Sequence, residues 1–533
     1  MVDDYRGRTP VELLNFFRSP GGHSLLIKGD AGTGKTTLAL QLIEELAEEM
    51  PDYYMSMRVS DEALYRQFPW LEEKSRRNNV LRMGRAFLTR TKKTFPRDAQ
   101  TIQEEGKLRV AKDLLKALSG TEGSKTVTRT ELLKLEGQIE SGEIGREEVA
   151  TFSAEVSEES IVFDVGAILP ELELAYDLVE ANLPKRTFLI VDSIDALAEH
   201  YGIERQRIMN TLQKDLVEQS GTNVAYVMET SEKNLFDYLG DGVVRLYNEQ
   251  RDGRRIRELI LEKLRGLRVD RWKYPFTLLD GRLRVLESLQ LRIPEDLEKH
   301  LPVKDPNEES ISTGNISMDS VLGGLPRGGV ILLEVGEDVS QEFLKAIEHV
   351  LIADQLSKRR GVVWFPLFAI NYAVLERQMR KLAGKEALSS GLRILDAEAD
   401  LEGRYDFVSM VEGSDATQDL RFNTLRYALS SAQEPYLSLL GFDSLQATYG
   451  MDALTDVLVH VEAMKRNGHV VVIEATSSSG VLKQLAHQAQ LHLRLESLAG
   501  TVVLCGVKPY TQYYYLDFER STGKIAPDLV AMV

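Results

Sequence analysis

The chain contains one octet whose residue types and spacing suit phosphate binding. Residues 29–36 read Gly-Asp-Ala-Gly-Thr-Gly-Lys-Thr, which matches the pattern G-x-x-x-x-G-K-[ST]. The apolar run Ser24-Leu-Leu-Ile-Lys28 predicts a strand before the octet, and Thr37-Leu-Ala-Leu-Gln-Leu-Ile43 predicts a helix after it. Glycines let successive backbone N–H groups turn towards one anion, and a helix N-terminus adds partial positive charge. The octet therefore predicts a phosphate-binding loop between a strand and a helix.

Two side chains of this loop carry most of its chemistry. We expect Lys35 to bind the β- and γ-phosphates of a nucleotide, and the Thr36 hydroxyl to bind Mg²⁺. The residues expected to surround the phosphates are Gly29, Asp30, Ala31, Gly32, Thr33, Gly34, Lys35, Thr36 and Thr37.

A second segment supplies an acid for the metal. The run Thr187-Phe-Leu-Ile-Val-Asp192 is apolar and ends in a carboxylate. Ligands bind beyond the C-terminal ends of parallel strands in open α/β sheets, so this pattern predicts that Asp192 lies beside the phosphate loop. We expect Asp192 and Thr36 to hold Mg²⁺ together, Asp192 either directly or through water.

The elements that position these residues occur twice. Three segments of the second half resemble three of the first half in the same order: Gly328 to Gly336 and Gly21 to Gly29, Tyr436 to Ser444 and the strand ending at Asp192-Ser193, and Gly468 to Thr476 and Gly221 to Thr230. The chain has 533 residues, which is too long for one hydrophobic core. The repeat predicts an α/β protein with two tandem P-loop domains and mainly parallel central sheets.

The second copy lacks the phosphate-binding residues. Residues 336–343 read Gly-Glu-Asp-Val-Ser-Gln-Glu-Phe at the place of the loop. By position, Glu342 replaces the lysine and Phe343 replaces the metal-binding hydroxyl. Because a carboxylate repels phosphate, we expect the second domain to be degenerate and to have no functional P-loop.

The two copies also differ in spacing. Lys35 and Asp192 are 157 positions apart (192 − 35), whereas Glu342 and Asp443 are 101 apart (443 − 342). The difference of 56 positions (157 − 101) predicts a helical insertion at about 97–159, either a passive surface elaboration or a lid or docking element. The expected organisation is a first domain at 1–290 that carries the insertion, a linker at 291–312, and a second domain at 313–533.

Composition limits the classes of function. Acidic residues outnumber basic residues by 82 to 65, a net charge of −17, which argues against a general nucleic-acid or membrane binder. The single cysteine, Cys505, excludes an internal disulfide and suits a reducing compartment. The N-terminus, Met1-Val-Asp-Asp-Tyr5, is acidic, and no apolar run approaches membrane-spanning length. We therefore expect a cytoplasmic protein without a membrane partner.

The paired layout is similar to that of the RecA-superfamily ATPases of the KaiC and GvpD type. The second half opens with Ile311-Ser-Thr-Gly314, Met318-Asp319 and Leu322-Gly-Gly-Leu-Pro-Arg-Gly328, which is close to the segment before the phosphate loop of KaiC-like domains. The first half ends with Lys263-Leu-Arg265-Gly266 and Tyr274-Pro-Phe-Thr277, similar to the end of such a domain. The resemblance implies two RecA-like domains, hydrolysis of ATP with Mg²⁺, and a ring or filament with ATP between neighbouring subunits.

The resemblance also implies a role for two cations. In KaiC-like rings a Lys-x-Arg-Gly turn projects at the γ-phosphate of the neighbouring subunit, and Lys263 and Arg265 match this turn. Cations aimed at a transferring phosphate stabilise its developing charge. The alternative is that both residues merely end a strand in solvent.

The chain departs from the family at the water-activating acid. The family carries a glutamate at the end of the strand after the phosphate-loop helix, but here Asp52-Tyr-Tyr-Met-Ser-Met57 is followed by Arg58-Val59. An arginine stays protonated in proteins and cannot act as a base. The available substitutes are Asp61, Glu62 and Glu229. We choose Glu229, because it ends a predicted central strand that faces the same crevice, and we expect hydrolysis to be slow.

Three functions are consistent with these observations. The first is a nucleotide-switched regulatory assembly, for which Arg58-Val59 and the basic turn at Arg251 to Arg257 favour a GvpD-like role in transcriptional regulation through a protein partner. The second, less favoured, is a DNA-handling ATPase of the recombination-mediator kind, whose candidate DNA contacts are Arg76 to Arg82, Arg85, Arg90, Lys92 and Lys93. The third is a scaffold that binds ATP without significant hydrolysis.

Overall fold

The chain folds into two compact units. The computed structural model describes residues 8–56, 61–71, 81–83, 175–176, 179, 182–201, 203–233, 235–288, 290–397, 404–450, 453–518 and 523–533. One unit comprises residues 1–249 and 257–285, and the other comprises residues 250–256 and 286–533. The predicted insertion at about 97–159 lies outside the described residues.

The first unit contains a nine-stranded sheet with helices on both of its faces. Its helices are α1 (Val11–Arg18), α2 (Lys35–Leu46), α3 (Asp61–Gln67), α10 (Ile194–Tyr201), α11 (Arg205–Leu212), the π-helix η2 (Gln213–Gln219) and the 3₁₀ helices η3 (Leu235–Tyr238) and η4 (Leu279–Gly281). Its strands are β1 (Ser24–Gly29), β2 (Asp52–Ser56), β3 (Leu81–Met83), β4 (Phe188–Asp192), β5 (Asn223–Met228), β6 (Gly242–Arg251), β7 (Arg254–Leu264), β8 (Lys273–Thr277) and β9 (Arg284–Val285).

The strand order of this sheet brings the predicted site residues to one edge. The order is β3-β2-β4-β5-β1-β6-β7-β8-β9, and the strands from β3 to β6 run parallel. Strands β1, β4 and β5 end at Gly29, Asp192 and Met228. Because the C-terminal ends of parallel strands lie at the same edge, these three positions line one crevice.

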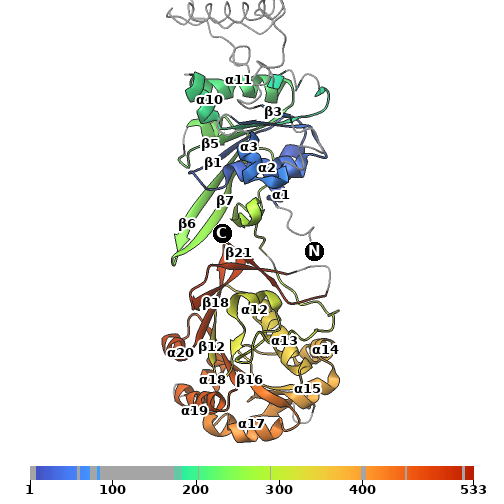
Figure 1. The fold of residues 1–533 in the computed structure, drawn as a ribbon, viewed down its shortest axis with the longest axis vertical. Helices are drawn as coiled ribbons and strands as arrows, with labels where there is room; N and C mark the ends of the chain where they lie inside the picture. Colours follow the sequence, from blue (N-terminus) through green and yellow to red (C-terminus); the bar gives the residue numbers. More distant parts are fainter. Residues whose placement is uncertain are drawn as a thin grey trace, which may run out of the picture. The chain divides into compact units, whose positions relative to one another are not determined.

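Alternate residues of the central strands pack on opposite faces of this sheet. On β2, Tyr54 belongs to the core formed with α1 and α2, whereas Tyr53 and Met55 belong to the core formed with α10 and α11. Figure 1 shows these two pairs of helices on either side of the strands. The arrangement follows from the two-residue period of a strand, which directs neighbouring side chains to opposite faces.

The second unit contains a ten-stranded sheet and a short two-stranded sheet. Its helices are α12 (Ile316–Leu322), α13 (Gln341–Ser357), α14 (Tyr372–Leu382), α15 (Lys385–Gly391), α16 (Ala416–Asp419), α17 (Phe422–Ala428), α18 (Phe442–Tyr449), α19 (Ala453–Arg466) and α20 (Leu482–Gln488). Its strands are β10 (Ser310–Ile311), β11 (Leu325–Pro326), β12 (Val330–Val335), β13 (Arg360–Phe365), β14 (Leu392–Asp396), β15 (Val408–Met410), β16 (Gln433–Gly441), β17 (Val470–Thr476), β18 (Leu491–Leu498), β19 (Thr501–Lys508), β20 (Tyr514–Asp517) and β21 (Asp528–Ala531).

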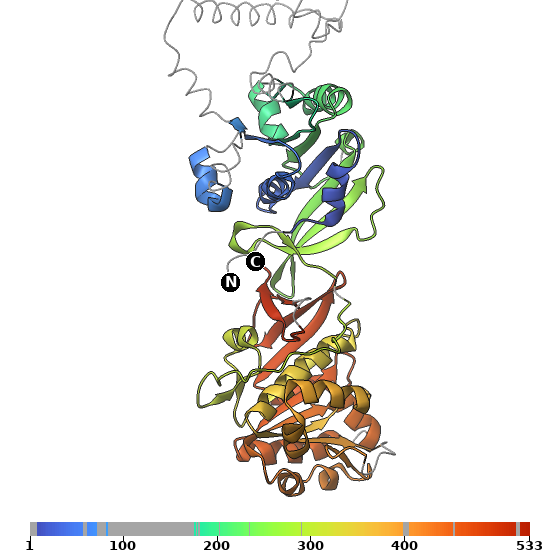
Figure 2. The same ribbon diagram turned by 90° about the vertical axis from the view of Figure 1, so that its right-hand side faces the viewer.

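The large sheet of the second unit repeats the topology of the first. Its order is β15-β14-β13-β16-β17-β12-β18-β19-β20-β21, so that β13-β16-β17-β12-β18 corresponds to β2-β4-β5-β1-β6. Helices α13 to α15 cover one face and α18 to α20 the other, and the first group faces the viewer in Figure 2. The predicted α/β class with two mainly parallel sheets is thus confirmed. In the described parts of the chain, no helix has the length and apolar character needed to span a membrane.

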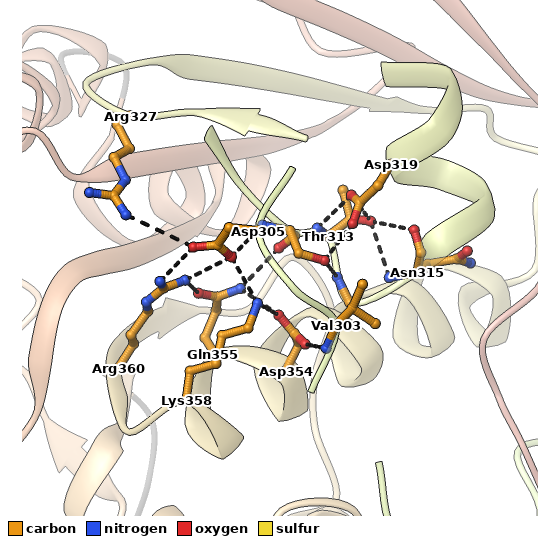
Figure 3. Close-up of polar contacts among 12 residues, drawn as sticks. Val303, Asp305, Thr313, Asn315, Asp319, Arg327, Asp354, Gln355, Lys358 and Arg360 are labelled. Carbon is orange, nitrogen blue, oxygen red and sulfur yellow. Dashed lines mark hydrogen bonds and ion pairs between the residues drawn. The ribbon is translucent and has the colours of Figure 1, made fainter. Parts of the chain in front are cut away.

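The segment before the second domain is held by ion pairs, which Figure 3 shows. Asp305 pairs with Arg360 Nη2 at 2.6 Å and with Lys358 Nζ at 2.9 Å. The buried Asp354 accepts from the backbone N–H of Val303 at 2.8 Å and pairs with Lys358 at 2.6 Å. Burial opposes ionisation, but hydrogen bonds from Arg360 and Lys358 hold the pKa of Asp305 well below its usual range. The predicted linker is therefore part of the second unit at this point.

Candidate nucleotide-binding site

The predicted phosphate loop joins β1 to α2. Strand β1 ends at Gly29, and α2 begins at Lys35. Gly32 and Gly34 have φ angles of 75° and 102°, which favour glycine because it has no Cβ atom. A Cβ atom on Gly29 would lie 2.7 Å from the carbonyl oxygen of Leu246, so this position has no room for a side chain. The backbone path of the loop therefore requires the glycines of the motif.

The Lys35 side chain is folded against its own loop. It is only 5% exposed, and its Nζ lies 2.9 Å from Oε2 of Glu229. The same Nζ donates to the carbonyl oxygen of Asp30 at 2.8 Å. Glu229 directly follows Met228, the last residue of β5. The structure thus brings two predicted site residues together, and the Glu229 carboxylate neutralises the ammonium group that is expected to bind phosphate.

Asp192 lies beside Thr36 at the tip of β4. Its Oδ2 accepts from Thr36 Oγ1 at 2.7 Å and from the Tyr54 hydroxyl at 2.8 Å. Burial raises the pKa of Asp192, and the charge of Glu229 raises it further, whereas the two hydroxyl donors lower it. The net shift is upward. Asp192 is therefore an acid whose ionised form depends on its hydrogen bonds.

The Thr36 and Asp192 pair suits Mg²⁺. A hydroxyl and a carboxylate are the hard oxygen ligands that Mg²⁺ prefers, and Mg²⁺ usually takes its remaining ligands from water and phosphate oxygens. Among the residues with described side chains, no group of three or more histidine, cysteine, aspartate and glutamate residues is placed to hold a metal ion.

Residues that the motifs did not indicate hold the rim of the site. Asp195 accepts from the backbone N–H of Glu229 at 2.7 Å and pairs with Arg205 at 2.5 Å. Ser231 donates to Asp30 Oδ1 at 2.7 Å. These contacts fix the segment after β5 against the phosphate loop. Asp195 follows Asp192 by three positions and could have been noticed, whereas Ser231 carries no signal in the sequence.

An arginine from β7 also contacts the loop. Arg257 is 8% exposed, and its Nη1 donates to the carbonyl oxygen of Gly32 at 2.9 Å. This residue lies in the basic segment Arg251 to Arg257. In the sequence that segment favours a family resemblance but gives no sign of a contact with the phosphate loop. The hairpin of β6 and β7 brings Arg257 back to the phosphate loop. The residues next to Arg257 in the sequence therefore could not predict this contact.

Lys263 and Arg265 lie far from the phosphate loop of their own chain. Lys263 Nζ donates to the carbonyl oxygen of Gly240 at 2.5 Å, and Arg265 pairs with Asp241 at 2.8 Å. Asp241 in turn accepts from Ser24, the first residue of β1, whereas the phosphate loop follows the last. Burial, followed by the charge of Arg265, lowers the pKa of Lys263. The two cations therefore occupy the opposite edge of the sheet.

The other candidates for water activation have no described side-chain contacts. Asp61 and Glu62 begin α3, but their side chains lie outside the described residues, as do Arg58 and Val59. Glu229 is thus the one candidate acid whose side chain the structure describes. The Glu229 side chain is 30% exposed, and its carboxylate contacts the loop by its ion pair with Lys35.

The side chains proposed for DNA contact cannot be placed either. The candidates Arg76 to Arg82, Arg85, Arg90, Lys92 and Lys93 have side chains outside the described residues.

The second unit has different side chains at the corresponding place. Helix α13 begins at Gln341 after the cap Ser340. Glu342 pairs with Lys345 at 3.1 Å. Phe343 is buried in the core against Phe518, with ring centroids 5.7 Å apart. The start of α13 thus presents a carboxylate and a buried ring where the first unit has Lys35 and Thr36.

One residue correspondence made on sequence is wrong. Asp443 was matched with Asp192, but its Oδ2 accepts from the backbone N–H of Thr476 at 2.7 Å, which is the contact that Asp195 makes with Glu229 in the first unit. Strand β16 ends at Gly441, whereas β4 ends at Asp192. The last residue of this strand in the second unit is therefore a glycine, where the first unit has Asp192.

Comparison with known proteins agrees with this geometry. Residues 13–262 match the family model described as "GvpD gas vesicle protein, P-loop domain". The chain is 24% identical to "Protein GvpD2" of Halobacterium salinarum over 530 residues, which cover 96% of this chain and 94% of that protein. It is also 24% identical to "Protein GvpD1" of the same organism over 413 residues, which cover 76% of this chain and 65% of that protein. The matched family region includes the phosphate loop, Asp192 and Glu229.

Proposed function

We propose that this chain, which belongs to the GvpD P-loop domain family and is homologous to GvpD1 and GvpD2, binds ATP with Mg²⁺ in its first domain and works as a nucleotide-switched regulatory assembly. One observation supports this proposal above others. Lys35, Thr36, Asp192 and Glu229 come from three separate segments and meet at one edge of the first sheet. Lys35, paired with Glu229, lies where a nucleotide phosphate is expected. Thr36 and Asp192, which are hydrogen-bonded to each other, lie where the metal is expected.

Each of these groups has a defined part in nucleotide binding. The backbone N–H groups of the loop and the N-terminus of α2 bind the phosphates, and Lys35 adds a formal positive charge. Thr36 and Asp192 hold Mg²⁺, which when bound neutralises phosphate charge. The Glu229 carboxylate lies next to Lys35, so it is the group proposed to orient water.

The Lys35–Glu229 pair gives this site a switch. A phosphate group and the Glu229 carboxylate compete for one ammonium group, because both are anions within reach of Lys35. Binding of ATP therefore releases Glu229 from Lys35, while Asp195 keeps the backbone of Glu229 in place. The orientation of the Glu229 side chain then depends on whether the site is filled.

The proposed assembly uses the edge of the first domain's sheet that lies opposite the phosphate loop. Lys263 and Arg265 are too far from their own loop to contact its nucleotide, so we assign them to the site of a neighbouring copy in a ring or filament. The second domain, which lacks the binding residues, contributes structure and contacts. A protein partner in transcriptional regulation, within the cytoplasm, is the role that the GvpD resemblance favours.

One equivalent of ATP is expected to bind per chain. The test is isothermal titration calorimetry with Mg-ATP, combined with mass measurement of the assembly and with ATP turnover in the presence and absence of single-stranded DNA. No binding would overturn the proposal, and two equivalents per chain would show that the second domain also binds nucleotide. Strong stimulation of turnover by single-stranded DNA would favour the DNA-handling alternative.

Replacing Glu229 with glutamine is expected to slow ATP turnover by about a hundredfold, the lower range for loss of a general base. Affinity for ATP should be retained or rise, because glutamine no longer neutralises Lys35 before the nucleotide arrives. Turnover and binding of a fluorescent ATP analogue measure the two effects separately. The matched control is Glu232→Gln, an exposed neighbour on the same segment, which should behave as wild type. Wild-type turnover in Glu229→Gln would exclude Glu229 as the base and direct attention to Asp61 and Glu62.

A further inference from the structure

Two neighbouring tyrosines on β2 have different surroundings. Tyr53 is 4% exposed, packs in the core beside α10 and α11, and accepts from Asn182 Nδ2 at 2.5 Å. Tyr54 is 2% exposed and packs in the core beside α2. Its hydroxyl donates to Asp192 Oδ2 at 2.8 Å. The Tyr54 ring therefore fills the core, while its hydroxyl contacts the acid of the proposed metal site.

Two neutral donors act on the same oxygen of Asp192. Tyr54 reaches Oδ2 from β2, and Thr36 reaches it from α2. The charged groups that act on this carboxylate are Lys35, which favours its ionised form, and Glu229, which opposes it. Burial also opposes ionisation, and the two hydroxyl donors hold the same carboxylate oxygen from two separate elements.

We propose that Tyr54 is a positioning residue for the magnesium site, holding the Asp192 carboxylate in one orientation. The proposal rests on the function proposed above. Thr36 lies in the first turn of α2, directly after the loop, and its hydroxyl is itself expected to bind Mg²⁺, whereas the Tyr54 ring is fixed in the core. Tyr54 therefore provides the restraint on Asp192 that does not depend on the state of the loop.

The test replaces Tyr54 with phenylalanine, which keeps the ring and removes the hydroxyl. Loss of a hydrogen bond to a charged group is expected to weaken nucleotide binding in Mg²⁺ by about tenfold. Binding in EDTA should stay at the wild-type level, since it does not use Asp192. The measurement is titration with a fluorescent ATP analogue in Mg²⁺ and in EDTA. Tyr53→Phe is the matched control, because it also removes a buried hydroxyl from β2 but on the opposite face.

The Mg²⁺ requirement of binding gives a second readout. The Mg²⁺ concentration needed for half-maximal enhancement of nucleotide binding should rise in Tyr54→Phe and stay unchanged in Tyr53→Phe. A purely structural role of Tyr54 would weaken binding in Mg²⁺ and in EDTA alike.

A double-mutant cycle makes the assignment specific. In the background of Asp192→Asn, Tyr54→Phe should cause no further loss of binding in Mg²⁺. If Tyr54→Phe fails to fold, 3-fluorotyrosine at position 54 serves instead: its more acidic hydroxyl is a stronger donor and should lower the Mg²⁺ concentration needed for half-maximal enhancement of binding. An unchanged Mg²⁺ requirement in that protein would contradict the inference.

The possible outcomes separate the two proposals. A wild-type chain that binds nucleotide no better in Mg²⁺ than in EDTA overturns both the magnesium site and the role of Tyr54. A wild-type chain with clear Mg²⁺ dependence, together with a Tyr54→Phe variant that reproduces its affinity and Mg²⁺ requirement, overturns the role of Tyr54 alone.

Discussion

Replacing Lys35 with alanine is expected to abolish measurable binding of Mg-ATP, with affinity lowered by about a hundredfold or more, because a buried ammonium that contacts phosphate makes charge-assisted hydrogen bonds. Lys35 is 5% exposed and lies at the N-terminus of α2, so alanine removes the formal positive charge beside the phosphate-binding backbone. Binding of a fluorescent ATP analogue and calorimetry measure the loss. The fold should persist, since Glu229 is 30% exposed and reaches water once its partner is removed.

The matched control for this variant lies in the second domain. Lys345 is the lysine near the start of α13, the helix that corresponds to α2, and it pairs with Glu342 at the surface. Lys345→Ala should bind ATP as the wild type does. If Lys345→Ala lost binding and Lys35→Ala kept it, nucleotide would occupy the second domain, and the assignment of the two domains would be reversed.

Replacing Arg265 with alanine is expected to lower ATP turnover by about a thousandfold while binding of ATP stays nearly intact, because the loss of one cation at the transferring phosphate has an effect of this size. Arg265 is bonded to Asp241, which contacts the first residue of β1. Strand β1 has six residues, and at about 3.3 Å per residue its ends are roughly 17 Å apart. Arg265 therefore acts on the nucleotide of another chain or does not act on nucleotide at all.

Mixing two inactive variants distinguishes these alternatives. Arg265→Ala keeps a complete phosphate loop, and Lys35→Ala keeps a complete Lys263–Arg265 turn. Mixed assemblies should therefore contain some interfaces with both parts and regain part of the activity. Arg268→Ala is the control, since Arg268 is an exposed neighbour paired with Asp270 at 2.6 Å. Assemblies that exchange subunits but regain no activity would argue that Arg265 only stabilises the end of its strand.

The sequence by itself determined the parts of this site that depend on neighbouring residues. The loop from Gly29 to Thr36 was predictable because its glycines, its lysine and its hydroxyl lie within eight positions of one another. Asp192 was predictable as a strand-end acid, because a buried parallel strand reads as an apolar run. The tandem α/β organisation followed from a repeated order of such strands, which the two sheets confirm.

Only the tertiary structure decided which side chains meet. Tyr54 and Asp192 are 138 positions apart, and their contact depends on β2 and β4 being neighbours in register. Arg257 reaches Gly32 across 225 positions because a hairpin returns along the sheet. Asp443 resembles Asp192 in its local sequence, yet it takes the place of Asp195, since strand ends and helix starts shift by a residue or two between the copies. The local sequence determines which chemical group a residue carries, but strand order, register and side-chain packing determine which other residue that group contacts.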